Sequence, residues 1–136
     1  MNPQIGPLAQ LALKARNQSY SPYSQCKVGA ALRTKTGEIF TGCNVENASY
    51  GGSVCAERVA IFKAVSEIGP SLQISELCVA TDASPPWEPC GFCRQVLQEF
   101  SDEKCAISLV NPQGELIHST LGKLFPNGFK KSSLGK

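Results

Sequence analysis

The chain has 136 residues, of which 42% are hydrophobic and 18% are charged, and its formal net charge at pH 7 is +2. These values are typical of one ordinary globular domain spanning residues 1–136. So small a net charge does not favour a nucleic-acid partner. No apolar stretch is long enough to span a membrane, and the N-terminus lacks the pattern of a signal peptide.

The seven cysteines are an odd number in a chain without an export signal. This usage predicts reduced thiols and metal ligands rather than disulfides, and hence a cytoplasmic protein. Three of the cysteines belong to the cluster described below. Cys43, Cys78 and Cys105 fall in strand-like stretches, where we expect them to act as small buried hydrophobes.

The first third of the chain predicts a helix followed by a hairpin. Apolar residues recur at helical spacing over residues 4–18, and Pro22 disfavours helix just beyond that range. Two strand-like stretches, residues 27–34 and 38–45, are separated by a turn at residues 36–37. They therefore predict an antiparallel pair.

The rest of the chain predicts alternating helices and strands after a loop at residues 47–53. Helices are expected at residues 55–67 and 91–100, strands at 74–81, 106–110 and 115–118, and a weak helical turn at 120–124. A proline-rich loop, residues 83–89, precedes the second of these helices. The order predicts an α/β sandwich with a mixed sheet, in which the hairpin is antiparallel and the strand-helix-strand units supply parallel pairs.

A split cysteine cluster dominates the chemistry of the sequence. Cys90 and Cys93 form a C-x-x-C pair, and the more distant Cys55 supplies a third thiol, one ligand short of a closed structural zinc site. Glu57 stands two residues after Cys55. Three ligands, an open position and a nearby acid/base are what metal-assisted hydrolysis requires, and zinc deaminases have this donor set. We therefore expect one zinc per chain, with Glu57 as the catalytic proton carrier and not a ligand.

Both halves of the cluster fall at predicted helix N-termini, where the helix dipole favours thiolates. Three thiolates on one zinc ion leave a net charge of minus one, which weakens the ability of the metal to acidify water. Arg58 lies three residues after Cys55 on the same helical face. We expect Arg58 to offset this charge by donating to the thiolates.

Two other interpretations of the cluster are a structural zinc module and a redox Cys90/Cys93 pair. A structural module needs a fourth protein ligand, yet there is no second C-x-x-C, and the single histidine, His118, falls in an expected edge strand. A redox pair would leave Cys55 and Glu57 without a role. The catalytic interpretation is therefore favoured over both.

Asn44 and Glu46 lie two residues apart at the end of the second predicted strand. If the extended backbone persists, their side chains point to the same side of the sheet. The residue types alone fit ordinary polar strand ends equally well.

These motifs, taken in order, resemble the small homotetrameric cytidine deaminases over almost the whole chain. The resemblance implies a cytidine deaminase-like α/β/α sandwich with a five-stranded mixed sheet. It also implies zinc-dependent conversion of cytidine and 2′-deoxycytidine to uridine and 2′-deoxyuridine with release of ammonia, a step of pyrimidine salvage. The matching stretches are the cysteine motifs with their neighbours, Ser21-Pro22-Tyr23-Ser24, Val28-Gly29-Ala30-Ala31, residues 42–48 and Leu124-Phe125-Pro126.

The resemblance also implies roles for individual residues. In that family the residues matching Asn44 and Glu46 hold the ribose hydroxyls, and the match to Ala56 makes backbone contacts to the base. The match to Arg58 partners the zinc thiolates. Aromatic residues of neighbouring subunits close the pocket, so the resemblance implies a homotetramer in which Phe129 has this function.

Two residues depart from the family pattern. Cys26 stands where the family usually has a Phe that packs on the pyrimidine, and Trp87 is unusual in the loop before the zinc pair. We expect Trp87 to fill the space that Cys26 leaves. Because both residues affect the shape of the pocket, the nucleoside antibiotic blasticidin S is the alternative substrate. A deaminase of single-stranded nucleic acid would need a basic groove and further stacking aromatics.

Overall fold

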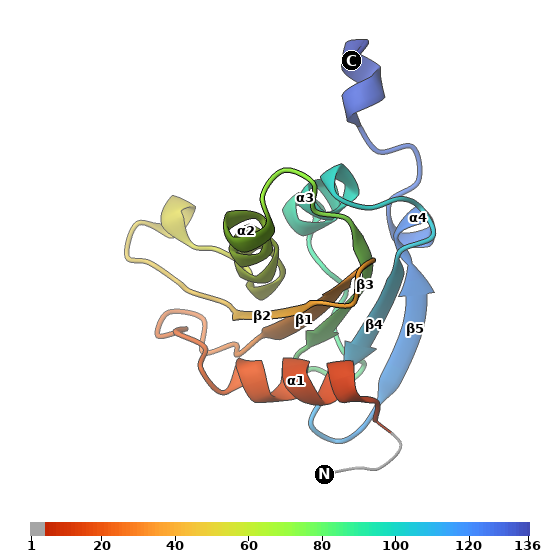
Figure 1. The fold of residues 1–136 in the computed structure, drawn as a ribbon. Coiled ribbons are helices and arrows are strands. Elements are labelled where there is room, and N and C mark those ends of the chain that lie inside the picture. Colours follow the sequence, from red (N-terminus) through yellow and green to blue (C-terminus); the bar gives the residue numbers. More distant parts are fainter. Residues whose placement is uncertain (1–4) are drawn as a thin grey trace.

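The computed structural model describes residues 5–136 and contains a five-stranded sheet with helices on both faces (Figure 1). The strands are β1 (Gly29–Thr34), β2 (Ile39–Cys43), β3 (Ile74–Ala80), β4 (Ala106–Val110) and β5 (Leu116–Thr120). The helices are α1 (Pro7–Arg16), α2 (Ala56–Ile68), α3 (Gly91–Glu99) and α4 (Leu121–Leu124), with short 3-10 turns at Tyr50–Gly52 and Lys131–Leu134.

The sheet has the strand order β2-β1-β3-β4-β5, and only β3 and β4 pair in parallel. The other neighbouring strands are antiparallel. The mixed five-stranded sheet is therefore confirmed. Of the two strand-helix-strand units, however, only the one through α3 gives a parallel pair. The crossover through α2 does not, because β1 lies between β2 and β3.

The layers follow from the alternation of side chains along the central strands. Ala31 of β1 packs with the buried face of α1, whereas its neighbours Ala30 and Leu32 join the larger core under α2. Such alternation is what a strand with both faces covered requires. Helix α1 thus covers one face of the sheet, and α2 and α3 lie side by side on the other (Figure 1).

Helix α2 approaches β2 closely at Gly42. A Cβ atom at this position would lie 2.6 Å from the backbone N of Ala60 and 2.7 Å from the backbone O of Ala56. Only glycine allows this approach without displacing the helix. The contact fixes the first turn of α2, which carries Glu57, against the sheet.

Several element boundaries differ from the sequence prediction. Helix α1 ends at Arg16, two residues before the expected end, because Asn17, Gln18 and Ser19 instead form turn hydrogen bonds to carbonyls three residues back. The expected start at residue 4 lies outside the described residues. Strand β2 ends at Cys43 and not at residue 45, since Val45 pairs only through isolated bridges with Tyr20 and Val54.

At the other edge of the sheet, β5 continues to Thr120, where it still pairs with Ala106 of β4. The expected strand ended at residue 118, and the expected helical turn began at residue 120. Among residues 5–136, no helix combines the length and apolar character that crossing a membrane requires.

Candidate active site

The three thiols of the split cluster come together at the start of two helices. Cys55 immediately precedes α2, Cys90 immediately precedes α3, and Cys93 lies in the first turn of α3. The Sγ atoms of Cys55 and Cys90 are 3.7 Å apart, and those of Cys90 and Cys93 are 3.5 Å apart. A tetrahedral zinc ion with Zn–S bonds of about 2.3 Å separates its sulfurs by about 3.8 Å. The thiols are therefore spaced as zinc ligands, as the sequence predicted.

The thiols differ in how readily they ionise. A hydrogen bond from Cys93 lowers the pKa of Cys55 to about 5, with a further contribution from Arg58. The same contact with Cys55, together with burial, raises the pKa of Cys93 above its ordinary value. Thiolate is the ligand form of cysteine, so the cluster already favours one ligand in its reactive state.

Arg58 lies against the cluster and carries its positive charge there. Its Nη2 donates to Cys55 Sγ at 3.5 Å, and its guanidinium carbon lies 5.4 Å from the centre of the Phe92 ring. Burial opposes the charge, but hydrogen bonds to Cys55 and Cys93 outweigh it and raise the pKa of Arg58. The guanidinium is thus held between an aromatic face and the sulfurs. The sequence did not single out Phe92, whose only signal is its place inside the C-x-x-C pair.

Glu57 is buried beside the thiols. Its side chain is 3% exposed, and its Oε1 has no hydrogen-bond partner among the described residues. Burial raises the pKa of the Glu57 carboxyl to about 7, since loss of hydration disfavours its charged form. An acid/base with a pKa near neutrality and a free oxygen is suited to carry protons for a bound molecule.

A pocket of about 170 Å³ opens onto this carboxyl. Its lining includes Asn44, Cys55, Ala56, Glu57, Trp87 and Cys90. The sequence had named all six residues. The orphaned carboxyl oxygen, the three spaced thiols and the pocket together form a site for a metal ion and a small polar molecule.

Comparison with known proteins agrees with this geometry. The family model of the cytidine and deoxycytidylate deaminase zinc-binding region matches residues 4–109. The chain belongs to this family.

Individual relatives extend the likeness to most of the chain. A cytidine deaminase of Sporosarcina psychrophila is 46% identical over 121 residues, which are 89% of this chain and 88% of the relative. The crystal structure of cytidine deaminase from Burkholderia pseudomallei has a TM-score of 0.82 at 43% identity, covering 90% of this chain and 96% of that one. A Blasticidin-S deaminase of Bacillus cereus is 34% identical over 106 residues, 73% of this chain and 74% of the relative.

In this deaminase-family chain, Asn44 and Glu46 both hold the loop at residues 19–28. Asn44 is buried, and its amide bonds to that loop at three points, described below. Glu46 accepts from the backbone N–H groups of Tyr23 and Ser24, at 3.0 and 3.1 Å, and from the Ser24 hydroxyl. The hydroxyl contact is the main cause that lowers the pKa of Glu46. Both side chains thus bond to the same loop, but only Asn44 lines the pocket.

Cys26 and Phe129 lie outside the lining of this pocket in the described chain. The backbone N–H of Cys26 donates to Ser24 Oγ at 3.0 Å, and its thiol lies 3.6 Å from the Ser24 carbonyl oxygen. Phe129 is 57% exposed, and its carbonyl oxygen accepts from the side-chain amides of Gln95 and Gln98. Within one chain, therefore, neither side chain closes the site.

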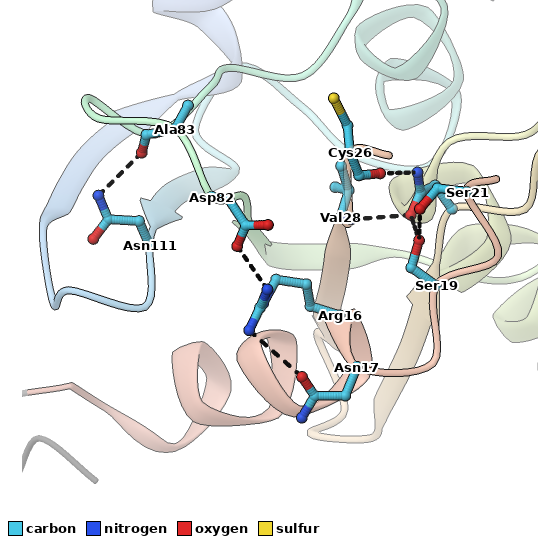
Figure 2. A network of polar contacts seen from close by, with 10 residues as sticks. Arg16, Asn17, Ser19, Ser21, Cys26, Val28, Asp82, Ala83 and Asn111 are labelled. Carbon is cyan, nitrogen blue, oxygen red and sulfur yellow. Dashed lines mark hydrogen bonds and ion pairs between the residues drawn. The ribbon is translucent and has the colours of Figure 1, made fainter. Parts of the chain in front are cut away.

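Trp87 forms a wall of the pocket from a loop that is pinned at both ends. At its start, Arg16 pairs with Asp82 at 2.6 Å, and Asn111 Nδ2 donates to the Ala83 carbonyl at 3.0 Å (Figure 2). The backbone N–H of Trp87 donates to Thr81 Oγ1 at 3.0 Å. At its end, Arg94 Nε donates to the Pro89 carbonyl at 2.7 Å. The sequence did not identify the anchors at Arg16 and Asn111, because these residues lie 66 and 28 positions from their partners in the chain.

Two of the remaining cysteines are small buried side chains, as the sequence predicted. Cys78 and Cys105 are buried, and burial raises the pKa of their thiols to about 12 and about 11. They therefore stay protonated at neutral pH, as small core side chains do. Cys43 is only half-buried, at the end of β2.

Proposed function

We propose that this chain catalyses the hydrolytic deamination of cytidine and 2′-deoxycytidine, giving uridine and 2′-deoxyuridine and releasing ammonia. The observation that carries the proposal is the buried Glu57 carboxyl, whose unpartnered oxygen lies in a pocket beside three thiols spaced as zinc ligands. Membership of the family and the relatives named cytidine deaminase support it. The reaction serves pyrimidine salvage, and we place it in the cytoplasm because the chain has unpaired thiols, which persist in a reducing compartment.

Cys55, Cys90 and Cys93 would hold the zinc, and Arg58 would offset the excess negative charge of their sulfurs. Bound there, zinc supplies a Lewis acid that makes water nucleophilic near neutral pH. Glu57 accepts the proton that the attacking water loses and delivers it to the ring nitrogen of the pyrimidine. It then carries the second proton to the leaving amine, so water and cytidine become uridine and ammonia.

The substrate is oriented by the other residues at the site. The backbone at Ala56, at the start of α2 and in the pocket lining, contacts the base. Asn44 and Glu46 bind the sugar hydroxyls. A polar pair placed to meet hydroxyls loses heavily when those hydroxyls are missing, because its groups are left unpaired.

A spectrophotometric assay tests the function over cytidine, 2′-deoxycytidine, cytosine, CMP, adenosine and blasticidin S. We expect turnover of the two nucleosides, and a kcat/KM for cytidine higher than that for cytosine by orders of magnitude. Comparable values for cytidine and cytosine would remove Asn44 and Glu46 as sugar ligands. Absence of turnover on every compound would contradict the deaminase itself.

Deamination of blasticidin S is the second candidate function. It is favoured by the likeness to a Blasticidin-S deaminase and by the unusual pocket wall at Trp87. In the same panel, turnover of blasticidin S above that of cytidine would assign the chain to this substrate.

Trp87 gives a prediction about the shape of the pocket. We propose that its indole takes the volume that an aromatic ring at Cys26 would fill, because it lines the pocket while its loop is pinned at both ends. We expect Trp87→Ala to raise KM for cytidine roughly tenfold or more with zinc retained, as loss of one aromatic contact does.

The Cys26→Phe variant is the companion measurement. A second aromatic ring would compete with the indole for the same volume, so we expect no improvement in KM. Steady-state kinetics on both variants checks this. An unchanged KM in Trp87→Ala together with a lower KM in Cys26→Phe would mean an open pocket suited to a bulkier substrate.

We further propose that the chain works as a homotetramer in which Phe129 reaches the pocket of a neighbouring subunit. Three aromatic side chains support this because they are largely exposed in the single chain: Tyr50 at 76%, Phe92 at 73% and Phe129 at 57%. Exposed aromatics are typical of interfaces. Light scattering should give the mass of four chains. An active monomer would contradict the proposal.

A further inference from the structure

The side-chain amide of Asn44 is fixed by groups from the loop at residues 19–28. Its Nδ2 donates to the Cys26 carbonyl at 2.8 Å, and its Oδ1 accepts from the Val28 backbone N–H at 3.0 Å. The Ser19 hydroxyl also bonds to this oxygen, at 2.5 Å. Figure 2 draws the contacts that Ser19, Cys26 and Val28 make here.

These contacts use most of the hydrogen-bonding capacity of the Asn44 amide. An amide oxygen accepts two hydrogen bonds and an amide nitrogen donates two. Val28 and Ser19 use both acceptor sites, and Cys26 uses one donor. One N–H therefore remains on a residue that lines the pocket. Asn44 can offer a bound molecule only a donor, so it selects an acceptor oxygen.

The backbone that carries the Ser19 side chain is itself held in place. The Ser19 N–H donates to the Arg16 carbonyl at 3.1 Å, and the N–H of the next residue, Tyr20, donates to the Asn44 carbonyl at 3.0 Å. These bonds link the end of α1 directly to the end of β2. The Ser19 hydroxyl also lies 3.0 Å from Ser21 Oγ. Because the amide oxygen of Asn44 can only accept, whereas the Ser21 hydroxyl can also donate, Ser19 gives its one hydroxyl proton to Asn44 and accepts from Ser21.

We propose that Ser19 is a positioning residue for substrate recognition, acting through Asn44 on a sugar hydroxyl of the nucleoside. The inference rests on the proposed function and adds a residue to it. The Ser19 hydroxyl restrains the oxygen end of the amide and closes its last acceptor site. A donor on the oxygen also polarises the amide, which strengthens its remaining N–H as a donor to the ligand.

The test compares cytidine with 2′,3′-dideoxycytidine, which lacks both secondary sugar hydroxyls. We expect Ser19→Ala to lower kcat/KM for cytidine roughly 3- to 10-fold, the range for one hydrogen bond. The same variant should leave kcat/KM for 2′,3′-dideoxycytidine unchanged, because that compound offers no hydroxyl oxygen to Asn44. Ser19→Thr keeps the hydroxyl and should restore most of the loss on cytidine.

Ser75→Ala is the matched control. The Ser75 hydroxyl is also part-buried and bonds to the Arg33 carbonyl at 3.1 Å. It lies near the start of β3, whereas Thr81, just after the end of that strand, lines the pocket. We expect this variant to leave kcat/KM unchanged for both compounds.

Three results would overturn the role of Ser19: an unchanged kcat/KM for cytidine in Ser19→Ala, an equal loss on both compounds, or a Ser19→Thr variant as slow as Ser19→Ala. An equal loss would mean that Ser19 supports only the fold. Absence of cytidine turnover by the unsubstituted protein would overturn the proposed function and this inference with it. The two failures are therefore distinguishable.

Discussion

Glu57→Gln should lower the turnover of cytidine by roughly 10²-fold or more while the protein keeps its zinc. The substitution preserves the size of the side chain and much of its hydrogen bonding, but an amide cannot take up and release the proton. The structure makes this a sharp test, since Glu57 is 3% exposed and its Oε1 has no hydrogen-bond partner among the described residues.

Glu67→Gln is the matched control, because Glu67 lies on the same helix and is exposed to solvent. We expect it to have the activity of the unsubstituted protein. Metal analysis of both variants distinguishes whether Glu57 transfers protons or binds the metal. Retained turnover in Glu57→Gln would refute proton transfer by this residue, and loss of zinc would make it a metal ligand instead.

The cysteine cluster was predictable because each part of it is local in sequence. The C-x-x-C spacing places Cys90 immediately before α3 and Cys93 in its first turn, and Arg58 follows Cys55 by about one helical turn. The positive ends of the helices fall where the sequence predicted. The metal geometry therefore depended only on α2 and α3 starting side by side, which the sheet topology provides.

The surroundings of the cluster were not predictable in the same way. The bonds of Asn44 to Ser19 and Cys26 join residues 25 and 18 positions apart, and the pair of Arg16 with Asp82 spans 66 positions. Strand periodicity indicates which side Asn44 faces, but not which loop lies there. Such contacts follow from how the elements pack, and no motif encodes them.

At the end of β2, the chain changes its pairing partner close to the candidate site. The expected strand ran to residue 45, yet the ladder with β1 stops at Cys43. Beyond it, the backbone of Asn44 and Glu46 pairs with Tyr20 of the loop. This change of partner brings the loop at residues 19–28 against the polar side chains of both residues. The departure from a regular strand therefore builds one side of the candidate sugar site.

Cys90→Ala should release the zinc and abolish activity. Loss of a group that only supports a ligand typically costs 10- to 100-fold in metal affinity, so we expect loss of a direct ligand to cost more than about 100-fold. After dialysis against a chelator, the unsubstituted protein should hold one zinc per chain and the variant almost none. Because a ligand bound to the native state stabilises it, the variant should also unfold at a lower temperature.

Cys78→Ala controls for the removal of a thiol as such. Cys78 packs with the face of α1, on the side of the sheet opposite to α2 and the cluster, and burial keeps its thiol protonated. This variant should keep its zinc and its turnover, with a small loss of stability from the missing sulfur. A Cys90→Ala protein with full zinc and full activity would remove Cys90 from the metal site. Since Cys55 and Cys93 alone leave zinc short of the three protein ligands typical of a catalytic site, that result would contradict the whole three-thiol assignment.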